Sequence, residues 1–144
     1  MMKILILNGP NLNMLGLRDP AIYGHETLAD IETLCRNAVQ DKAESSIDFR
    51  QSNYEGELVT WIQQARGTFD ALIINGGAYT HSSVALHDAL ELFDGKIVEV
   101  HISEPKNREA FRHFSYIEPC ADHRIAGKGA KGYVMALEWL STQN

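Results

Sequence analysis

The sequence predicts one α/β domain in which helices cover both faces of a parallel β-sheet. Its 144 residues are the length of a single ordinary domain, so we expect residues 1–144 to fold as one unit. Short apolar runs alternate with amphipathic stretches roughly every 25 residues. Most of these runs are continuously apolar, which is typical of strands that are buried on both faces.

The first strand and helix are each bounded by recognisable residues. The first apolar run covers residues 3–7 and ends at the turn-forming residues 8–11. A helix then begins at Thr27, which can cap its first turn, while Asp30 favours the N-terminal helix dipole. Its apolar face follows at helical spacing and consists of Leu28, Ile31, Leu34, Ala38 and Val39. Residues 47–50 form the predicted second strand.

The remaining elements continue this alternation. A second helix ends at Gly67 and has an apolar stripe made of Leu58, Trp61, Ile62 and Ala65. A strand over 71–74, a helix over 82–93 and a strand over 97–101 follow. We then expect a short helix over 108–113, a weak strand at 116–117, and a last helix with a stripe of Tyr133, Ala136, Leu137 and Leu140. Five such strand–helix units predict a doubly wound sheet of the flavodoxin-like kind.

Composition and charge exclude several classes of protein. Apolar residues make up 44% of the chain and charged residues 22%, as in soluble globular proteins, which excludes disordered and fibrous chains. Thirteen Lys and Arg against nineteen Asp and Glu argue against a nucleic-acid partner, because binding a polyanion needs clustered cations. We find neither a signal peptide nor an apolar run near the ~20 residues that cross a bilayer, so we expect a cytoplasmic protein with no membrane partner.

One glycine motif resembles a nucleotide-binding fingerprint. Glycines at 127, 129 and 132 match G-x-G-x-x-G, but a dinucleotide fold needs a strand on each side of the motif and an acidic residue ~20 residues on. Only twelve residues follow Gly132, so the second strand cannot form. The turn at 8–11 also lacks a phosphate-binding pattern. We therefore expect a glycine loop before the last helix, and neither a nicotinamide nor a flavin cofactor.

Metal and acyl-enzyme chemistry are not favoured either. Cys35 and Cys120 are too few for a disulfide scaffold and too far apart for C-x-x-C chemistry. The six histidines include no H-E-x-x-H and no zinc-finger spacing, so we expect no metal, and His87 with Asp88 is best explained by a structural or interface role. The serines at 82–83 lack a nucleophile elbow.

Polar and glycine residues gather where three predicted strands end. Open parallel sheets bind ligands beyond the carboxyl ends of their strands, and those ends are residues 8–11, 75–77 and 101–103. His101 ends the fourth strand, and Glu99 lies on the same face of it, where a carboxylate can fix the tautomer of the imidazole and keep it protonated. This edge of the sheet is the predicted site.

The loop over residues 13–25 adds two further candidates for acid–base work. Arg18 and Tyr23 lie in it, and its glycines and Pro20 are typical of a mobile lid. Taken singly, Tyr23 could cover a surface, His101 could be structural and Arg18 could be a solvated charge. Their occurrence together with further polar residues favours a catalytic site, the others being Asn11, Asn75, His81 and Arg112.

Four ordered motifs run through the chain. The first is Asn-Gly-Pro-Asn-Leu-Asn at 8–13 with Arg18 and Tyr23, and the second covers residues 49–53 and 55–58. The third joins Asn75 to residues 77–81 and 83–86, and the fourth covers 99–103, 108–109 and 111–113. Over essentially its whole length, the chain resembles the type II 3-dehydroquinate dehydratases.

The resemblance implies a flavodoxin-like lyase that converts 3-dehydroquinate to 3-dehydroshikimate through an enolate, without metal or Schiff base, in the third step of the shikimate pathway. Tyr23 would take the proton from C2, a water near Asn11 would help the enolate, and His101 would protonate the departing C1 hydroxyl. A free phenol ionises only near pH 10, about 4 kcal/mol from neutral conditions. One cation at ~4 Å supplies about that much while burial opposes it, so we expect Arg18 and Arg108 to act together.

The resemblance also implies a substrate-binding set and an assembly. The set consists of Asn75, Gly77, His81, Ile102, Ser103 and Arg112, with Asp88 contributed by a neighbouring subunit of a trimer. Such trimers would assemble into a homo-dodecamer. Arg112 would suit the planar carboxylate of the substrate.

Two alternative readings stay open. The same reaction could serve quinate degradation, or the chain could be a catalytically silent paralogue that binds a cyclic carboxylate. The silent reading is supported by departures from the family pattern at residues 104–106 and 122–124, where Glu104 adds a negative charge beside Ser103. Tyr54, Gly76 and Lys128 also depart from the pattern, but no predicted acid, base or substrate ligand is lost.

Overall fold

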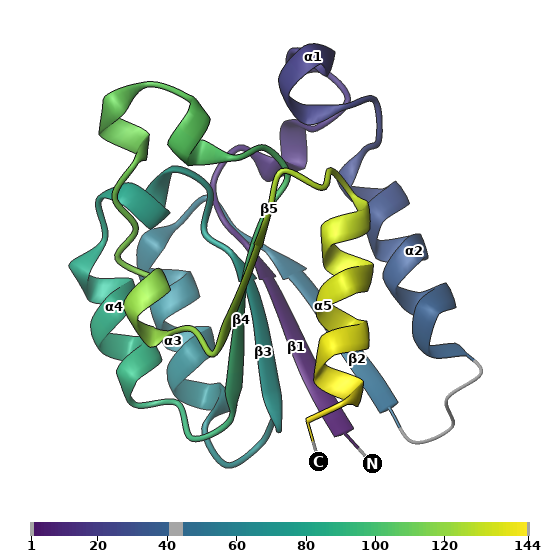
Figure 1. The fold of residues 1–144 in the computed structure, drawn as a ribbon. Helices are drawn as coiled ribbons and strands as arrows, with labels where there is room; N and C mark the ends of the chain where they lie inside the picture. Colours follow the sequence, from purple (N-terminus) through teal and green to yellow (C-terminus); the bar gives the residue numbers. More distant parts are fainter. Residues whose placement is uncertain (1, 41–44, 144) are drawn as a thin grey trace.

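The computed structural model describes residues 2–40 and 45–143, and Figure 1 shows their fold. Five parallel strands form one sheet in the order β2-β1-β3-β4-β5. The strands are β1 (Met2–Asn8), β2 (Ser45–Gln51), β3 (Ala71–Asn75), β4 (Lys96–His101) and β5 (His123–Ala126). The predicted parallel sheet is thus confirmed, and its carboxyl ends lie together along one edge.

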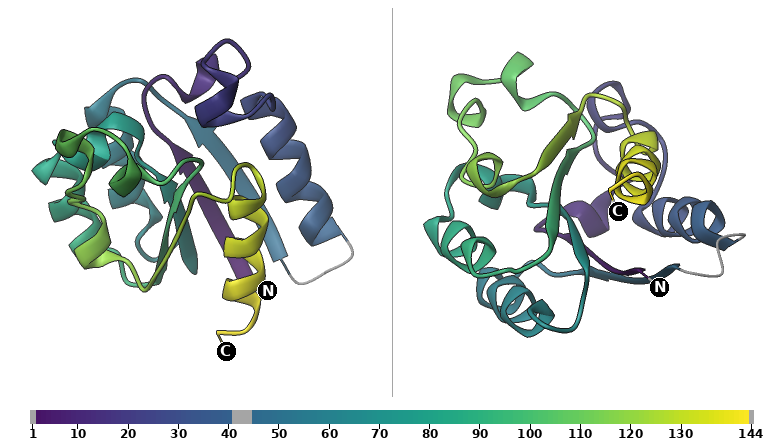
Figure 2. Two further views of the ribbon diagram at one scale, coloured as in Figure 1. Left: turned by 45° about the horizontal axis from the view of Figure 1, so that its top comes forward. Right: turned by 60° about the horizontal axis from the view of Figure 1, so that its bottom comes forward.

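Helices cover both faces of the sheet, as predicted. They are α1 (Pro20–Tyr23), α2 (Leu28–Gln40), α3 (Glu55–Ala65), α4 (Val84–Glu91) and α5 (Lys131–Ser141). Figure 2 shows α2 and α5 on one face of the sheet, and α3 and α4 on the other. Successive residues of β1 point to opposite faces, so Ile4 and Ile6 enter one core while Leu5 and Leu7 enter the other.

Three predicted helix boundaries have a visible physical cause. The backbone N–H of Asp30 donates to Thr27 Oγ1 at 3.1 Å and that of Thr27 donates to Asp30 Oδ2 at 2.9 Å, which confirms the capping of α2. Gly67, with φ +77°, follows the end of α3. The helix predicted over 82–93 is shorter at both ends: α4 covers Val84–Glu91, and it begins at Val84 because Ser83 Oγ accepts the N–H of Leu86 at 2.9 Å and caps the first turn.

The predictions for residues 108–117 are wrong. Instead of a helix over 108–113 there is only a 3₁₀ turn at Ala110–Arg112, whose Phe111 is exposed and provides no apolar face. Residues 116–117 form no strand. Ile117 is buried and directly precedes the 3₁₀ turn Glu118–Cys120, in which Pro119 lacks the N–H that a continuing strand would need. The fifth strand is instead β5, at the edge of the sheet.

The glycine motif at 127–132 leads into α5, as expected. The strand β5 does precede it, but no strand follows it among the described residues. Cys35 is fully buried on the core-facing side of α2, which confirms its packing role, and burial raises the pKa of its thiol to about 12. In the ranges 2–40 and 45–143, no helix is both long and apolar enough to cross a membrane.

Candidate active site

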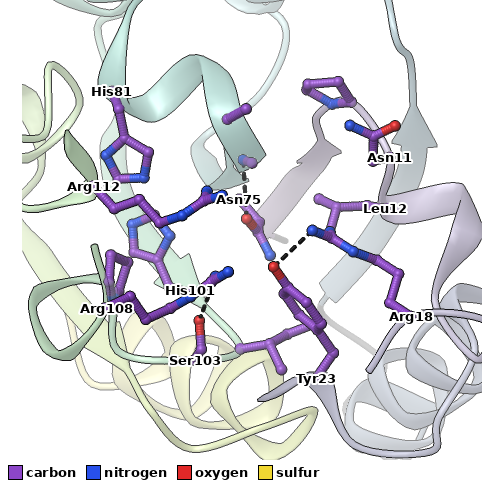
Figure 3. A pocket seen from close by; sticks show the side chains of 15 residues that line it. Asn11, Leu12, Arg18, Tyr23, Asn75, His81, His101, Ser103, Arg108 and Arg112 are labelled. Carbon is purple, nitrogen blue, oxygen red and sulfur yellow. Dashed lines mark hydrogen bonds between the residues drawn. The ribbon is translucent and has the colours of Figure 1, made fainter. Parts of the chain in front are cut away.

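A cavity lies at the carboxyl ends of β1, β3 and β4, beneath α1 (Figure 3). Its walls come from the loops that follow these strands. Every predicted site residue except Glu99 and Asp88 lines it, namely Asn11, Arg18, Tyr23, Asn75, Gly77, His81, His101, Ile102, Ser103, Arg108 and Arg112. Pro10, Leu12, Ala78 and Pro105 complete the lining. Residues distant in sequence meet here because parallel strands end at the same edge.

Two guanidinium groups surround the phenol of Tyr23. Arg18 Nη2 donates to the Tyr23 hydroxyl oxygen at 2.6 Å, and its guanidinium carbon lies 3.8 Å from the ring centroid. The guanidinium carbon of Arg108 lies 5.2 Å from the same centroid. Two cationic groups therefore lie against a single tyrosine side chain inside the cavity.

The imidazole of His101 is held by a buried carboxylate. His101 Nε2 lies 2.7 Å from Glu99 Oε2, and Glu99 is fully buried. Burial would raise the pKa of Glu99, but hydrogen bonds from His101 and Ser115 and the charge of Arg124 outweigh it and lower the pKa. Because Nε2 faces Glu99, Nδ1 is the nitrogen left to serve a ligand, and it can donate a proton only when the ring is an imidazolium.

Ser115 and Arg124 support Glu99, and neither was among the predicted site residues. Ser115 Oγ donates to Glu99 Oε2 at 2.7 Å. Arg124 Nε lies 3.6 Å from Glu99 Oε1, and Arg124 also makes two hydrogen bonds to the carboxylate of Glu104, at 3.2 and 2.8 Å. These bonds hold the pKa of Glu104 below its usual range. The negative charge of Glu104, which the sequence places beside Ser103, is therefore paired with the guanidinium of Arg124 in β5.

The arginines and His81 around the rim have defined partners. Arg112 Nε donates to the Glu109 carboxylate at 3.3 Å, which leaves its terminal nitrogens free to contact a ligand. Arg108 Nη1 donates to Ser103 Oγ at 3.3 Å (Figure 3). His81 Nδ1 lies 2.8 Å from the carbonyl oxygen of Phe114, and burial lowers the pKa of His81. Figure 3 shows these side chains converging on the cavity from the side opposite Arg18.

The floor of the cavity is a buried polar network. Asn75 Nδ2 donates to the hydroxyl oxygen of Tyr133 at 2.9 Å, and the Tyr133 hydroxyl donates to Asn8 Oδ1 at 2.7 Å. Asn75 Oδ1 in turn accepts the N–H of Gly77 at 3.2 Å. Tyr133 is fully buried, and burial raises its pKa, so its hydroxyl stays protonated and can make this bridge. Sequence analysis treated Tyr133 only as part of an apolar stripe.

Tyr133→Phe tests this network through stability. We expect the free energy of unfolding to fall by about 1–3 kcal/mol, because the change leaves two buried atoms, Asn8 Oδ1 and Asn75 Nδ2, without a partner. Urea denaturation followed by circular dichroism measures this loss. The control is Tyr54→Phe, whose side chain is 75% exposed and which should change stability by less than about 0.5 kcal/mol. Equal stability of the two variants would contradict the role of the bridge.

The close packing of two turns also shapes the floor. A Cβ on Gly9 would collide with the carbonyl oxygen of Gly76, so the turns after β1 and β3 can approach this closely only with glycine at position 9. Asn11 follows in the left-handed region at φ 68°, a conformation that asparagine tolerates. These turns fix the backbone on which Asn11 and Gly77 enter the cavity.

Asp88 lies outside the cavity, on the exposed side of α4. The described residues contain one group of three candidate metal ligands, and it too lies outside the cavity. The cavity itself offers hydrogen-bond donors and cationic groups in place of a nucleotide-binding loop, which suits a small polar anion.

The fold and the cavity together define a flavodoxin-like α/β enzyme with a polar, cation-rich cavity at the carboxyl edge of its sheet. A family model described as dehydroquinase class II matches residues 2–141. The chain belongs to this family.

Individual relatives agree with the family match. The 3-dehydroquinate dehydratase of Bartonella tribocorum is 56% identical over 140 residues, which cover 97% of this chain and 93% of that protein. The Streptomyces coelicolor 3-dehydroquinate dehydratase is 54% identical, with coverages of 94% and 86%. Among solved structures, a type II dehydroquinase from Butyrivibrio crossotus superposes with a TM-score of 0.94 at 44% identity and 97% coverage of both chains.

Proposed function

We propose that this chain is a type II 3-dehydroquinate dehydratase, a lyase that removes water from 3-dehydroquinate to give 3-dehydroshikimate. The observation that carries this is the hydrogen bond of 2.6 Å from Arg18 to the phenol of Tyr23, in the same cavity as His101, whose imidazole is held by the buried Glu99. A base and an acid are therefore available together, each next to the charged group that it needs.

In the proposed first step, Tyr23 as a phenolate removes the proton from C2 of the substrate, next to the ketone. The electron pair of the C–H bond moves into an enolate, and the phenol becomes neutral. Arg18 and Arg108 stabilise the phenolate before this transfer, because both guanidinium groups lie close to the ring. Asn11 holds the water that donates to the enolate oxygen.

In the second step, the enolate re-forms the ketone and the C1 hydroxyl leaves. His101, as an imidazolium, gives the proton from Nδ1, and the products are water and the conjugated ketone. Glu99 stabilises the imidazolium through its hydrogen bond of 2.7 Å to Nε2. His101 then takes a proton from solvent, and Tyr23 releases to solvent the proton that it removed from C2. Each turnover therefore ends with both groups in their starting state.

The cationic rim supports binding of the substrate carboxylate and hydroxyls. We assign this role to Asn75, Gly77, His81, Ile102, Ser103 and Arg112, all of which line the cavity. Asp88 is exposed on α4 and lies outside the cavity of its own subunit, so we propose that it reaches the cavity of a neighbour in a trimer. Assembly of four trimers into a dodecamer, a single domain over residues 1–144, a cytoplasmic location and a place in aromatic biosynthesis complete the proposal.

Adding 3-dehydroquinate to the purified protein tests the reaction directly. Dehydration conjugates the ketone with a new double bond, so we expect near-ultraviolet absorbance to rise with time. Sodium borohydride added with the substrate should leave the activity intact, because no imine forms on a lysine. A flat absorbance trace would overturn the proposed activity and favour the silent paralogue. Inactivation by borohydride would overturn the metal-free and imine-free mechanism.

Arg124 and Glu104 provide a test of how the site tolerates its departures from the family pattern. Arg124→Gln frees the negative charge of Glu104 beside Ser103, so we expect the KM for the anionic substrate to rise about tenfold, or 1.4 kcal/mol. The double variant Glu104→Gln/Arg124→Gln removes that charge and should restore KM to within about threefold. Steady-state kinetics measure both. If the double variant binds no better than Arg124→Gln alone, Glu104 is not the cause.

A further inference from the structure

A second cluster of reactive side chains joins α4 to the segment before β5. His87 and Glu91 lie one helical turn apart on α4, and Cys120 lies in the 3₁₀ turn Glu118–Cys120. One donor atom from each of these residues lies within 4.8 Å of the other two. We propose that His87, Glu91 and Cys120 form a binding site for a divalent transition-metal ion, with Zn²⁺ as the best match.

The imidazole of His87 is oriented as a metal ligand. Its Nδ1 lies 2.8 Å from the carbonyl oxygen of Tyr116, which can only accept, so Nδ1 carries the proton. Nε2 contacts the carboxylate of Glu91, and a metal ion that enters between these two atoms would displace the proton they share and take up the lone pair of Nε2. A backbone carbonyl that fixes the tautomer and ring plane in this way is the usual outer partner of a metal-binding histidine.

Cys120 supplies a thiolate, the ligand that favours a transition-metal ion over Mg²⁺ or Ca²⁺. Its Sγ lies 3.4 Å from His87 Nδ1, and it forms no disulfide. Burial, and then the negative charges of Glu91 and Asp88, raise the pKa of its thiol to about 11. The same charges attract a cation. When a metal ion binds, the S–H bond breaks, a metal–sulfur bond forms and the proton leaves to solvent.

The surroundings fit a cation better than an anion. The hollow beside these residues is also lined by Asp122, and none of the described residues that line it is Lys or Arg. Leu90, Phe93 and Ile97 provide apolar walls on the same side. A thiolate, an imidazole and a carboxylate match Zn²⁺ and exclude Mg²⁺ and Ca²⁺, which prefer oxygen ligands only, and a water can take the fourth tetrahedral position.

Titration of the reduced protein with Co²⁺, followed by Zn²⁺, tests the site. We expect a thiolate-to-cobalt charge-transfer band in the near ultraviolet, saturating at one Co²⁺ per chain and lost when Zn²⁺ is added. Cys120→Ser should abolish the band, whereas His87→Gln and Glu91→Gln should each weaken Zn²⁺ binding at least tenfold in calorimetry. The matched control is His25→Gln, an exposed histidine elsewhere that should leave binding unchanged.

Thermal unfolding gives a second readout that is independent of enzyme activity. Zn²⁺ should raise the Tm of the wild-type protein, because a ligand that binds only the folded chain stabilises it, and should not raise that of Cys120→Ser. The absence of a charge-transfer band would overturn the proposal. So would a Zn²⁺ affinity that is the same in the wild type and in all three ligand variants, which would mean surface binding elsewhere.

Discussion

Replacing Tyr23 with Phe should lower kcat on the order of 10³-fold while leaving the Tm unchanged. The variant loses only the hydroxyl oxygen that accepts from Arg18 at 2.6 Å, and with it the group that removes the C2 proton. Stability should not change because α1 contains no fully buried residue. Steady-state assays of dehydration and thermal unfolding by circular dichroism measure the two effects.

Two further variants make this result specific. Tyr54→Phe loses the same atom from an exposed tyrosine and should keep the wild-type rate. Arg18→Lys keeps a positive charge but not the planar donor fork, so its kcat should fall between those of wild type and Tyr23→Phe. A Tyr23→Phe enzyme with a rate within tenfold of wild type would rule out the phenol as the base.

The variant His101→Gln should lower kcat on the order of 10²- to 10³-fold with little change in KM. Glutamine can still bond to Glu99 but cannot deliver a proton, so the departing hydroxyl lacks its acid. The loss should fall on the second step alone. Dehydration kinetics and the Tm, which separates chemistry from folding, are the measurements.

Solvent exchange distinguishes the acid from the base. In D₂O, His101→Gln should still replace hydrogen at C2 of 3-dehydroquinate by deuterium, because the enolate forms and returns without losing hydroxide. Tyr23→Phe should exchange far more slowly. Proton nuclear magnetic resonance of the recovered substrate reports both. The reverse pattern, with exchange lost in His101→Gln and kept in Tyr23→Phe, would interchange the assigned roles.

The sequence predicted β1, β3 and β4 well because they are buried on both faces and therefore largely apolar. The edge strand β2 still alternates apolar Ile47 and Phe49 with polar residues, whereas in β5, at the other edge, the partly buried His123 and Arg124 obscure the pattern. At Ile117 the sequence predicted a strand that does not exist. Ile117 is fully buried, but it belongs to a connecting segment whose side chain packs into the core. A single apolar residue therefore indicates that its side chain is buried, but it does not indicate that its backbone forms a strand.

The candidate site was predictable where its residues follow strand ends or belong to family motifs. The residues that support it were not, because their partners are distant in the chain and have no characteristic spacing: Ser115 and Arg124 reach Glu99 from other segments, and Tyr133 reaches Asn75 from α5. Tyr133 did carry a usable signal, since a hydroxyl within an apolar helical stripe needs a buried partner. In the sequence, Arg124 and its partner Glu104 were notable only because both positions depart from the family pattern.

The helix that carries Tyr23 has only four residues, and none of them is fully buried. Detaching it exposes little apolar area, so the free energy of this local opening lies far below that of global unfolding. We therefore expect the phenol to move away from the cavity and return without disturbing the glycine turns below. Hydrogen exchange of the backbone amides of residues 21–23 should be much faster than in β1. Substitutions in this short helix can then change turnover with little effect on thermal stability, because the packed sheet sets the latter.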